Sequence, residues 1–458
     1  MTPRLYLRAL LLDRWMRIRF TPLGRMLLAG LIAVGLFALN PRATLAYQLA
    51  ALLLAVVVGA MLWAPLFRAR VRALRRLPRY ATAGVAFSYT LEIENRSRRT
   101  LGECEVADEP AGVSAAAAMA HARARQAAPR RGWRRVGYMG FVRALRQIEG
   151  VHCTPVRVPP LAAGERARIT VSLTPQRRGQ LHLARLRLTR SDPLGVFRAL
   201  LRIARADRLL VLPRRYPVSW SGAGGALRHA RPGRSRARST GNGNEFARLR
   251  EYRPRDSLRH IHWRAWARLG EPVVKEFHDE SPSRSALVFD TRAPSQCSAD
   301  TFEEAVSVAA SFVTDSGWRS GRLDALIAGD SAVQLSQDGD GEGLNRMLEV
   351  LASVERAAHD APGVTDKTLL ARIGGCDACV LVLLDLDARC QSLVRAVQAA
   401  RVTTLVLVVA HDAAVRVRAG AGGVLDASRV HAIAPGSAAR VLAGLHADPP
   451  AVRRRSVA

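Results

Sequence analysis

Two long apolar runs near the start of the chain dominate its pattern of hydrophobic and polar positions. The run from Leu45 to Phe67 contains no charged residue, and a helix of that length crosses a hydrocarbon core of about 30 Å. The run from Met26 to Leu39 is shorter and spans only if residues 21–25 join it, and Asn40-Pro41 separates the two runs as a turn. The pattern predicts a transmembrane helical hairpin over residues 23–67, after a basic leader over residues 1–22.

Arginines flank both ends of the predicted hairpin, whereas its turn carries only Arg42. By the positive-inside rule, both termini and the soluble domains are expected in the cytoplasm, at the inner membrane of a bacterium. The flanking residues are Arg4, Arg8, Arg14, Arg17, Arg19 and Arg25 before the hairpin, and Arg68, Arg70, Arg72, Arg75, Arg76 and Arg79 after it. A cleaved signal peptide is the alternative. The long leader and the second apolar run favour the hairpin.

After the hairpin, short runs alternate between apolar and polar residues, which is typical of half-buried strands. They predict a β-sandwich-like domain over residues 78–215. The expected strands are Phe87–Asn95, Val156–Val158, Arg168–Leu173 and Leu181–Leu188. An Ala- and Arg-rich insertion over residues 111–147 interrupts the pattern, and we interpret it as partly helical or disordered. A linker rich in Gly, Arg and Ser follows over residues 216–243, and its arginines either are solvated or contact phosphates.

Residues 285–447 alternate continuous apolar strands with amphipathic helices, which predicts a doubly wound α/β domain with a parallel sheet covered on both faces. Strands are expected at Ala286–Asp290, Leu323–Ala328, Cys379–Asp385, Thr403–Ala410 and Val430–Ala434. Helices are expected at Thr301–Ser316 and Gly343–Ala358, after Asp385, and from Gly436 onwards. Residues 448–458 form a tail. The fold class is therefore α+β with several domains.

The charge and the cysteines add two constraints. The formal net charge is +31, with 69 Lys and Arg against 38 Asp and Glu, yet only Lys275 and Lys367 are lysines. Such a bias arises from a GC-rich genome combined with membrane topology, and the alternative is a real anionic ligand. The cysteines have no regular spacing, which fits a reducing compartment. They are Cys104, Cys153, Cys297, Cys376, Cys379 and Cys390.

The most distinctive segment covers residues 244–280 and resembles the signature of the domain-of-unknown-function-58 (DUF58) family. The matching positions are Phe246, Leu249, Arg250, Tyr252, Pro254, Asp256, Arg259, Ile261, Trp263, Ala267 and Arg268. Two departures are Arg255, where the family has Gly, and Trp266, where it has a small residue. Upstream, Arg178-Gly179, Asp192–Phe197 and Val211–Arg214 also resemble the family, so that the resemblance runs from about Tyr80 to Val409.

Three interpretations of this signature segment are open. In the first, Asp256 caps a short helix, and Arg–Asp pairing with Trp packing fixes the segment between the two soluble domains. In the second, the segment recognises a partner protein. In the third, it carries a catalytic site.

The resemblance also implies that residues 285–447 form a von Willebrand factor A-like domain. Such domains can hold a divalent cation on Asp, Ser and Thr oxygens at the end of a strand. The matching strand ends at Asp290, but Arg292 and Pro294 stand where serines belong, and Arg292 is expected to neutralise Asp290. Asp385 is a weak candidate for a second acid. We therefore expect no metal or other cofactor.

Two further patterns carry weaker chemistry. Cys376 and Cys379 have a redox spacing but lead into a strand, which favours buried thiols. His260 and His262 with His278 could ligate a metal, although an H-x-H pair alone is a weak signal. No phosphate loop, nucleophile elbow or H-E-x-x-H motif is found in the sequence.

These observations predict a membrane-anchored, non-enzymatic scaffold. The family resemblance implies a partner, a MoxR-type AAA+ ATPase, and a role in assembling envelope complexes. One alternative is a metal-dependent adhesion module of the von Willebrand type. Another is an arginine-driven binder of nucleic acid or anionic lipid, although no nucleic acid is expected in the leading hypothesis.

Overall fold

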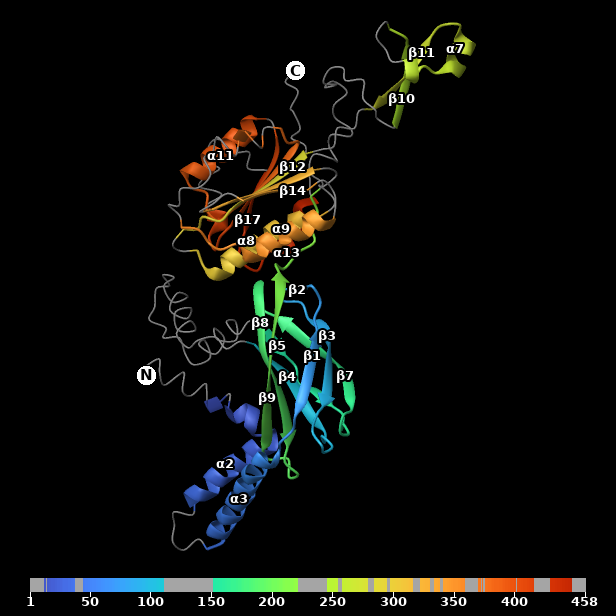
Figure 1. Cartoon of the computed structure of the whole chain (residues 1–458). Helices are drawn as coiled ribbons and strands as arrows, with labels where there is room; N and C mark the ends of the chain where they lie inside the picture. Colours follow the sequence, from blue (N-terminus) through green and yellow to red (C-terminus); the bar gives the residue numbers. More distant parts are fainter. Residues whose placement is uncertain are drawn as a thin grey trace. The chain divides into compact units, whose positions relative to one another are not determined.

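A computed structural model describes most of the chain (Figure 1). The described ranges are 12–37, 44–110, 151–220, 245–253, 258–278, 284–315, 322–329, 333–337, 341–358, 370–400, 402–415 and 429–446, without positions 14, 295, 296, 372 and 374. The predicted insertion 111–147, the tail 448–458 and most of the linker 216–243 lie outside them. The chain forms two compact units. Unit 1 contains residues 1–215, 296–310 and 348–355, and unit 2 contains the remainder.

Unit 1 begins with two apolar helices, α2 (Pro22–Phe37) and α3 (Thr44–Trp63), which pack against each other and are followed by the short 3-10 helix η1 (Ala64–Leu66). Within the described residues, one helical segment, Leu45–Leu66, is long and apolar enough to cross a membrane, and α2 is shorter. Most of the predicted hairpin is thus present as two helices, but by length and composition one of them qualifies as a span.

Two β-sheets follow in unit 1, with the orders β1-β3-β7-β5 and β2-β9-β8-β4-β6. Their strands are β1 (Val71–Arg76), β2 (Tyr80–Thr82), β3 (Phe87–Asn95), β4 (Cys104–Pro110), β5 (Val151–Cys153), β6 (Val156–Val158), β7 (Arg166–Pro175), β8 (Gly179–Ser191) and β9 (Arg198–Leu212). A shared core of apolar side chains from both sheets, including Leu91, Ile93 and Leu173 from one and Val106, Leu183 and Leu188 from the other, joins them. The sheets therefore pack face to face.

Five of the described strands of unit 1 were not predicted from the sequence, namely β1, β2, β4, β5 and β9. β1 lies before the predicted start at residue 78 and pairs with β3, from Val71 opposite Asn95 to Arg76 opposite Thr90. The alternating pattern does not predict this strand, because the inward-facing position 75 holds an arginine instead of an apolar residue. Arg75 is buried together with Asp108. β9 was also unpredicted, because arginines occupy many of its outward positions and break up its apolar run.

Unit 2 contains a six-stranded sheet with the order β14-β13-β12-β15-β16-β17. The strands are β12 (Arg284–Asp290), β13 (Arg322–Ala328), β14 (Val333–Gln337), β15 (Ala378–Leu383), β16 (Thr403–Val409) and β17 (Val430–Ile433). All neighbours are parallel except β14, which runs antiparallel to β13. The expectation of an entirely parallel sheet is wrong at this edge. Val333–Gln337 is a half-exposed strand with alternating residues, so it lacks the continuous apolar run by which the other strands were predicted.

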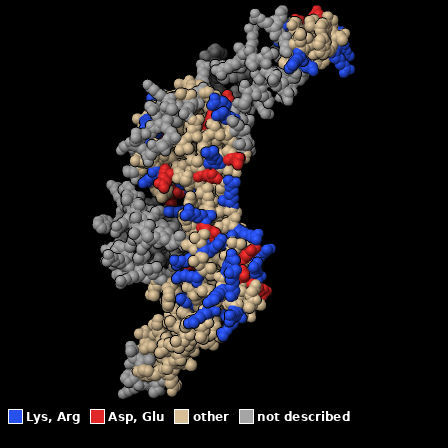
Figure 2. All heavy atoms as spheres, viewed as in Figure 1, with Lys and Arg blue, Asp and Glu red and all other residues tan. Residues whose placement is uncertain are grey.

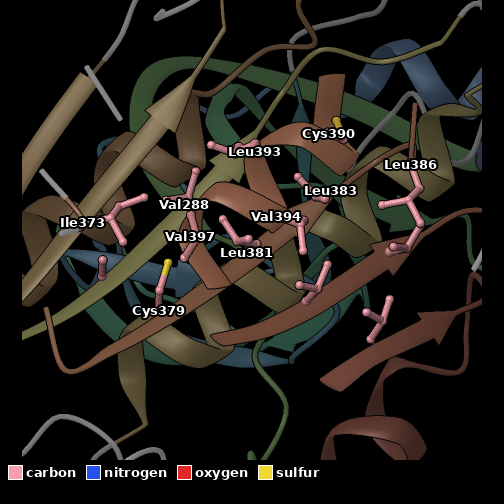
Figure 3. Packing of buried hydrophobic residues seen from close by; sticks show 14 of the residues in the cluster. Val288, Ile373, Cys379, Leu381, Leu383, Leu386, Cys390, Leu393, Val394 and Val397 are labelled. Atoms are coloured by element: carbon pink, nitrogen blue, oxygen red, sulfur yellow. The ribbon is translucent and has the colours of Figure 1, made fainter. Parts of the chain in front are cut away.

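Among the described residues, four helices alternate along the chain with these strands, in the order that the sequence pattern indicated. They are α8 (Ala299–Thr314), α9 (Gly341–Ser353), α11 (Ala388–Ala399) and α13 (Ala438–Ala443). On one face, Leu393, Val394 and Val397 of α11 pack with Val288 of β12 and Leu381 of β15 (Figure 3). Asp387 begins α11 by accepting a hydrogen bond from the N–H of Cys390 at 2.7 Å. The described chain is thus a mixed α/β protein with several sheets.

Candidate functional site

The signature segment folds into a small substructure of its own within unit 2. β10 (Glu245–Glu251) pairs antiparallel with β11 (Val273–His278), and the chain between them forms the 3-10 helix η2 (Leu258–His260) and the helix α7 (Trp263–Leu269). We call the described residues 245–253 and 258–278 the signature module. Backbone bonds close it, because the N–H of Tyr252 donates to the carbonyl of Pro272 at 2.9 Å and that of His262 to Val273 at 2.8 Å.

α7 is short, and side-chain and backbone contacts fix both of its ends. Nδ1 of His262 accepts a hydrogen bond from the N–H of Ala265 at 2.9 Å, so that a histidine is the N-cap. Gly270 ends the helix in the left-handed region, with φ of 73°, where glycine has no Cβ penalty. Sequence reasoning did not identify this cap, and the cap that it did predict, Asp256, lies outside the described residues and stays a prediction. The sequence does contain a signal for this cap, because the polar residue His262 stands immediately before the Trp263–Leu269 helix.

The module presents an aromatic pair to solvent. Trp263 and Trp266 lie one turn apart on α7 and stack, with ring centroids 5.3 Å apart and planes inclined by 22°. Trp263 is 64% exposed although it is one of the two largest side chains of the helix. Leu258 and Leu269 are exposed to a similar degree. Trp266, the departure from the family pattern, is half-buried and stacks on the exposed Trp263.

The other predicted signature residues are only partly brought together. Arg259 and Arg268 are exposed and Arg250 is half-buried, with its guanidinium donating to the carbonyl of Glu251 at 3.1 Å. Tyr252 is half-buried and Leu249 is 40% exposed. Pro254 and Asp256 lie outside the described residues, as does the side chain of Phe246. The described part of the module is therefore a basic surface around two stacked indoles.

Asp290, the candidate metal ligand, is engaged by an arginine. It ends β12 and is 5% exposed. Nε of Arg292 lies 2.9 Å from one carboxylate oxygen, and Nη2 lies 2.6 Å from the other. The backbone N–H of Arg292 donates to the first oxygen as well, at 3.1 Å. This side-on pair places a positive charge where a cation would bind, as expected from the sequence.

Asp385, the second candidate acid, and the described histidines of the signature module do not add a metal-binding cluster. Asp385 follows β15, and its carboxylate accepts a hydrogen bond from the N–H of Leu386 at 2.8 Å. His262 is the cap of α7, and the side chain of His278 is not described. Among the residues that the structure describes, no group of three or more His, Cys, Asp or Glu side chains is arranged to hold a metal ion.

The two cysteines with redox spacing are core residues. Cys379 is fully buried in β15 and Cys376 is 7% exposed just before it. Both belong to the apolar cluster of unit 2, in which Figure 3 shows the Cys379 sulfur among valine, leucine and isoleucine side chains. Burial raises the pKa of both thiols, most strongly at Cys379. They are free thiols that stay protonated, which fits the buried-thiol interpretation.

The Arg178-Gly179 motif has a role that the sequence did not reveal. The Arg178 side chain is 6% exposed, and its guanidinium pairs with the carboxylate of Glu303 and donates to the carbonyl of Val354 at 2.6 Å. It also lies over the ring of Phe302, 5.3 Å from the centroid. Within unit 1, this arginine ties the start of β8 to parts of α8 and to the chain after α9.

Comparisons with solved structures give only distant likenesses. One is the CARDB domain of a Pyrococcus furiosus protein, at 10% identity and a TM-score of 0.17, covering 32% of this chain and 90% of that one. Another is Escherichia coli alpha-2-macroglobulin, at 15% identity and a TM-score of 0.18, covering 33% of this chain and 8% of that one. A third is PapD-like domain 7 of human CEP192, at 12% identity and a TM-score of 0.15, covering 31% and 85%.

No curated protein matches the chain. A family match does exist, and it starts inside β10 and ends at the first residue of β17. It therefore covers most of the signature module and nearly all of the six-stranded sheet, but not the upstream motifs of unit 1. Over residues 248–430, this chain matches the family described as protein of unknown function DUF58, which supports the family resemblance of its signature segment.

Proposed function

We propose that this protein is a membrane-attached, non-enzymatic interaction protein whose signature module binds a partner protein. The observation that carries the proposal is the exposed Trp263, stacked on Trp266 at the surface of a folded module. A large aromatic side chain that is left in water on a capped helix costs solubility, and binding a partner offsets that cost.

The surroundings of the tryptophan pair favour a protein partner. Trp and Arg are the residues that most often dominate binding energy at protein interfaces, where they sit in the desolvated centre. Here Arg264 and Arg268 lie on the same helix as the pair, and both are exposed. Leu258 and Leu269 add apolar area beside them. An apolar centre bordered by arginines fits a partner with an apolar pocket and an acidic rim.

The membrane attachment rests on α3 and its flanks. The Leu45–Leu66 segment has the length and composition of a membrane span, and exposed apolar side chains such as Leu52 and Leu62 line it. We infer that α2 crosses as well, as the first half of a hairpin. With Arg17 and Arg19 before α2, Arg25 in its first turn and Arg68 after α3, the positive-inside rule then favours both ends in the cytoplasm of a bacterium.

The identity of the partner follows from the family resemblance. Genes of that family often lie beside genes for MoxR-type AAA+ ATPases, so we propose such an ATPase as the partner, acting on envelope complexes. The anchor would hold the ATPase at the membrane, and the module would provide the contact. At Asp290 both carboxylate oxygens are bonded to Arg292, which supports the interaction protein over a cation-dependent module.

The test is a crosslinking pull-down of the full-length protein from native membranes, with Trp263→Ala compared against Val415→Ala. Val415 is 66% exposed and lies outside the module, so it controls for loss of an exposed apolar side chain. We expect an AAA+ ATPase with the wild type and with Val415→Ala, and its loss with Trp263→Ala. Equal recovery from both variants would exclude the module as the contact, and recovery of no ATPase would overturn the partner.

A further inference from the structure

The turn between β8 and β9 packs against the beginning of α2. This turn covers Asp192–Phe197, one of the segments that resembles the family. The backbone N–H of Thr21 donates to the carbonyl of Val196 at 3.2 Å, and its hydroxyl donates to the carbonyl of Gly195. Gly24 approaches so closely that a Cβ there would lie 2.0 Å from the Val196 carbonyl oxygen. The turn and the helix are therefore fitted to each other.

The same turn also reaches one face of α3. Val57 and Ala60 of α3 are buried in a cluster with Phe20, Val196 and Phe197. The rings of Phe20 and Phe197 meet edge to face, with centroids 5.0 Å apart. The turn thus contacts α3 well inside the candidate span, because Val57 lies roughly 13 Å of helix rise before the end of that span at Leu66.

At the level of this contact, the outward side of the helices is apolar apart from the exposed Arg25. Val58, Met61 and Leu62 of α3 are exposed, and so are Leu23 and Met26 of α2. If a bilayer surrounds this part of α3, these side chains face lipid, and the β8–β9 turn lies at the same depth. Headgroup layers are about 5–7 Å thick on each side of the hydrocarbon core, so the turn passes through the headgroups.

A turn that enters lipid needs satisfied backbone donors and an apolar tip, and this turn has both. Its backbone donors are satisfied internally, because the buried carboxylate of Asp192 accepts hydrogen bonds from the N–H groups of Leu194, Val196 and Phe197 at 3.1, 2.6 and 2.8 Å. Gly195, with φ of 67°, allows the chain to reverse. The side chain at the tip is Leu194, which is 60% exposed, at a turn position where polar residues are the rule.

Arginines surround the same end of the two sheets. The loop after β3 meets the chain before β1, where the N–H of Arg96 donates to the carbonyl of Arg70 at 2.7 Å, and Arg190 lies over the ring of Trp63. We call the arginines of this end the collar. They are Arg68, Arg70, Arg96, Arg98, Arg99, Arg166, Arg190 and Arg198. Figure 2 shows basic side chains spread over the sheets beside an almost uncharged helix pair.

We propose that the β8–β9 turn enters the lipid bilayer beside α2 and α3, with Leu194 among the acyl chains and the collar on the phosphates of anionic phospholipids. The inference rests on the membrane attachment proposed above. Each collar arginine near an anionic surface is attracted to it, and the guanidinium suits phosphate oxygens. The sandwich would then be held to the membrane by two elements, and α3 would be fixed in orientation relative to it.

The first test places a photoreactive benzoylphenylalanine at single positions of the full-length protein, reconstituted in nanodiscs of phosphatidylglycerol and phosphatidylethanolamine. The positions are Leu194, Leu52 in the middle of α3 as a membrane reference, and Val85 as the matched control. Val85 is 51% exposed in the turn before β3, at the opposite end of the sheets from the helices. We expect lipid adducts at positions 194 and 52 and none at 85.

Each other outcome has a distinct meaning. Adducts at position 52 alone would overturn the insertion of the turn and leave the membrane attachment intact. Adducts at neither 52 nor 194 would overturn the attachment and the inference together. A protein or nucleic-acid adduct at 194 in native membranes, with no lipid adduct, would assign the tip to another occupant and reject the inference.

A second test addresses the collar. Thr100 is exposed next to Arg99, and the photoreactive residue at that position samples the headgroup layer. We expect lipid adducts in anionic nanodiscs and their loss in nanodiscs of phosphatidylcholine alone. A yield that does not depend on the lipid charge would overturn the role of the collar.

Discussion

The guanidinium of Arg292 lies side-on against the carboxylate of Asp290, two residues earlier in the chain, and occupies both of its oxygens. Both side chains are almost fully buried, at 7% and 6% exposed. The pair lies at the carboxyl end of a central parallel strand, where open α/β sheets usually bind their ligands. In this chain the position is therefore filled by an internal cation.

The first prediction concerns divalent cations at this strand end. We expect Mg²⁺ or Mn²⁺ to bind no more tightly to the wild type than to Asp290→Asn, because a bound ion would have to displace a bidentate guanidinium. Isothermal titration calorimetry of the full-length protein in detergent measures this directly. Wild-type binding that disappears in Asp290→Asn would contradict the prediction and revive the metal-dependent adhesion module.

A second prediction compares two glycines of α2. Gly24→Ala should loosen the junction with the β8–β9 turn, because the new Cβ would lie 2.0 Å from the Val196 carbonyl oxygen. Gly30→Ala is the control, since nothing lies within 4 Å of its Cβ, and it should stabilise the helix by about 0.8–1 kcal/mol.

Thermal unfolding in detergent and hydrogen exchange of residues 192–197 would separate the two variants. We expect lower stability and faster exchange only with Gly24→Ala. Equal behaviour of both variants would show that the close approach does not constrain the helix.

A third prediction concerns the buried ion cluster between the two sheets of unit 1. Arg75 pairs with Asp108 and, at 2.8 Å, with Asp207, while the hydroxyl of Tyr89 donates to Asp108. The side chains of Arg75 and Asp108 are fully buried. Arg75→Met should lower the free energy of unfolding by about 3–5 kcal/mol, because it leaves a buried carboxylate without its cation.

The neighbouring residue supplies the control for this cluster. Arg76 is 63% exposed and pairs with Glu92, so Arg76→Met should cost about 1 kcal/mol or less. The double variant Arg75→Met with Asp108→Asn should recover part of the loss, since it removes both charges together. Denaturant unfolding curves of the four proteins measure these differences. Similar losses from Arg75→Met and Arg76→Met would contradict the buried pairing.

A fourth prediction follows from Asp324 on β13. Burial acts to raise the pKa of this carboxyl, but hydrogen bonds from Ser336, Arg284 and Arg322 outweigh it and lower the pKa from its ordinary 3.8. A lowered pKa in the folded state means that the ionised form contributes stability above 3.8, and that this stability is lost as the pH falls through the folded value.

The experiment compares the wild type with Asp324→Asn. At neutral pH the variant should unfold at a lower temperature, and the difference should shrink as the pH falls below 3.8. A difference that is independent of pH would mean that the ionised carboxylate is not what stabilises this part of the sheet. Thermal unfolding of the full-length protein at a series of pH values gives the answer.

The sequence alone determined those parts of the fold whose pattern is local. The strands Phe87–Asn95 and Val156–Val158 were predicted with the bounds that the structure has. Their apolar and polar residues alternate from one position to the next, so the pattern is complete within each strand. From β12 to α13, the strands and helices lie within a few residues of their predicted places, except β14. Continuous apolar strands that alternate with amphipathic helices are compatible with few folds other than a mainly parallel sheet covered by helices.

Only the tertiary structure decided the roles that depend on partners distant in the chain. Arg75 appears in the sequence as one of many basic flanking residues, yet it is a core residue, because Asp108 and Asp207 come from other strands. The Asp192–Phe197 turn was visible as a motif, but its fit to Thr21 and Gly24 was not. Periodicity reports which side of its own element a residue faces. It cannot report which element lies opposite, because that depends on how the whole chain packs.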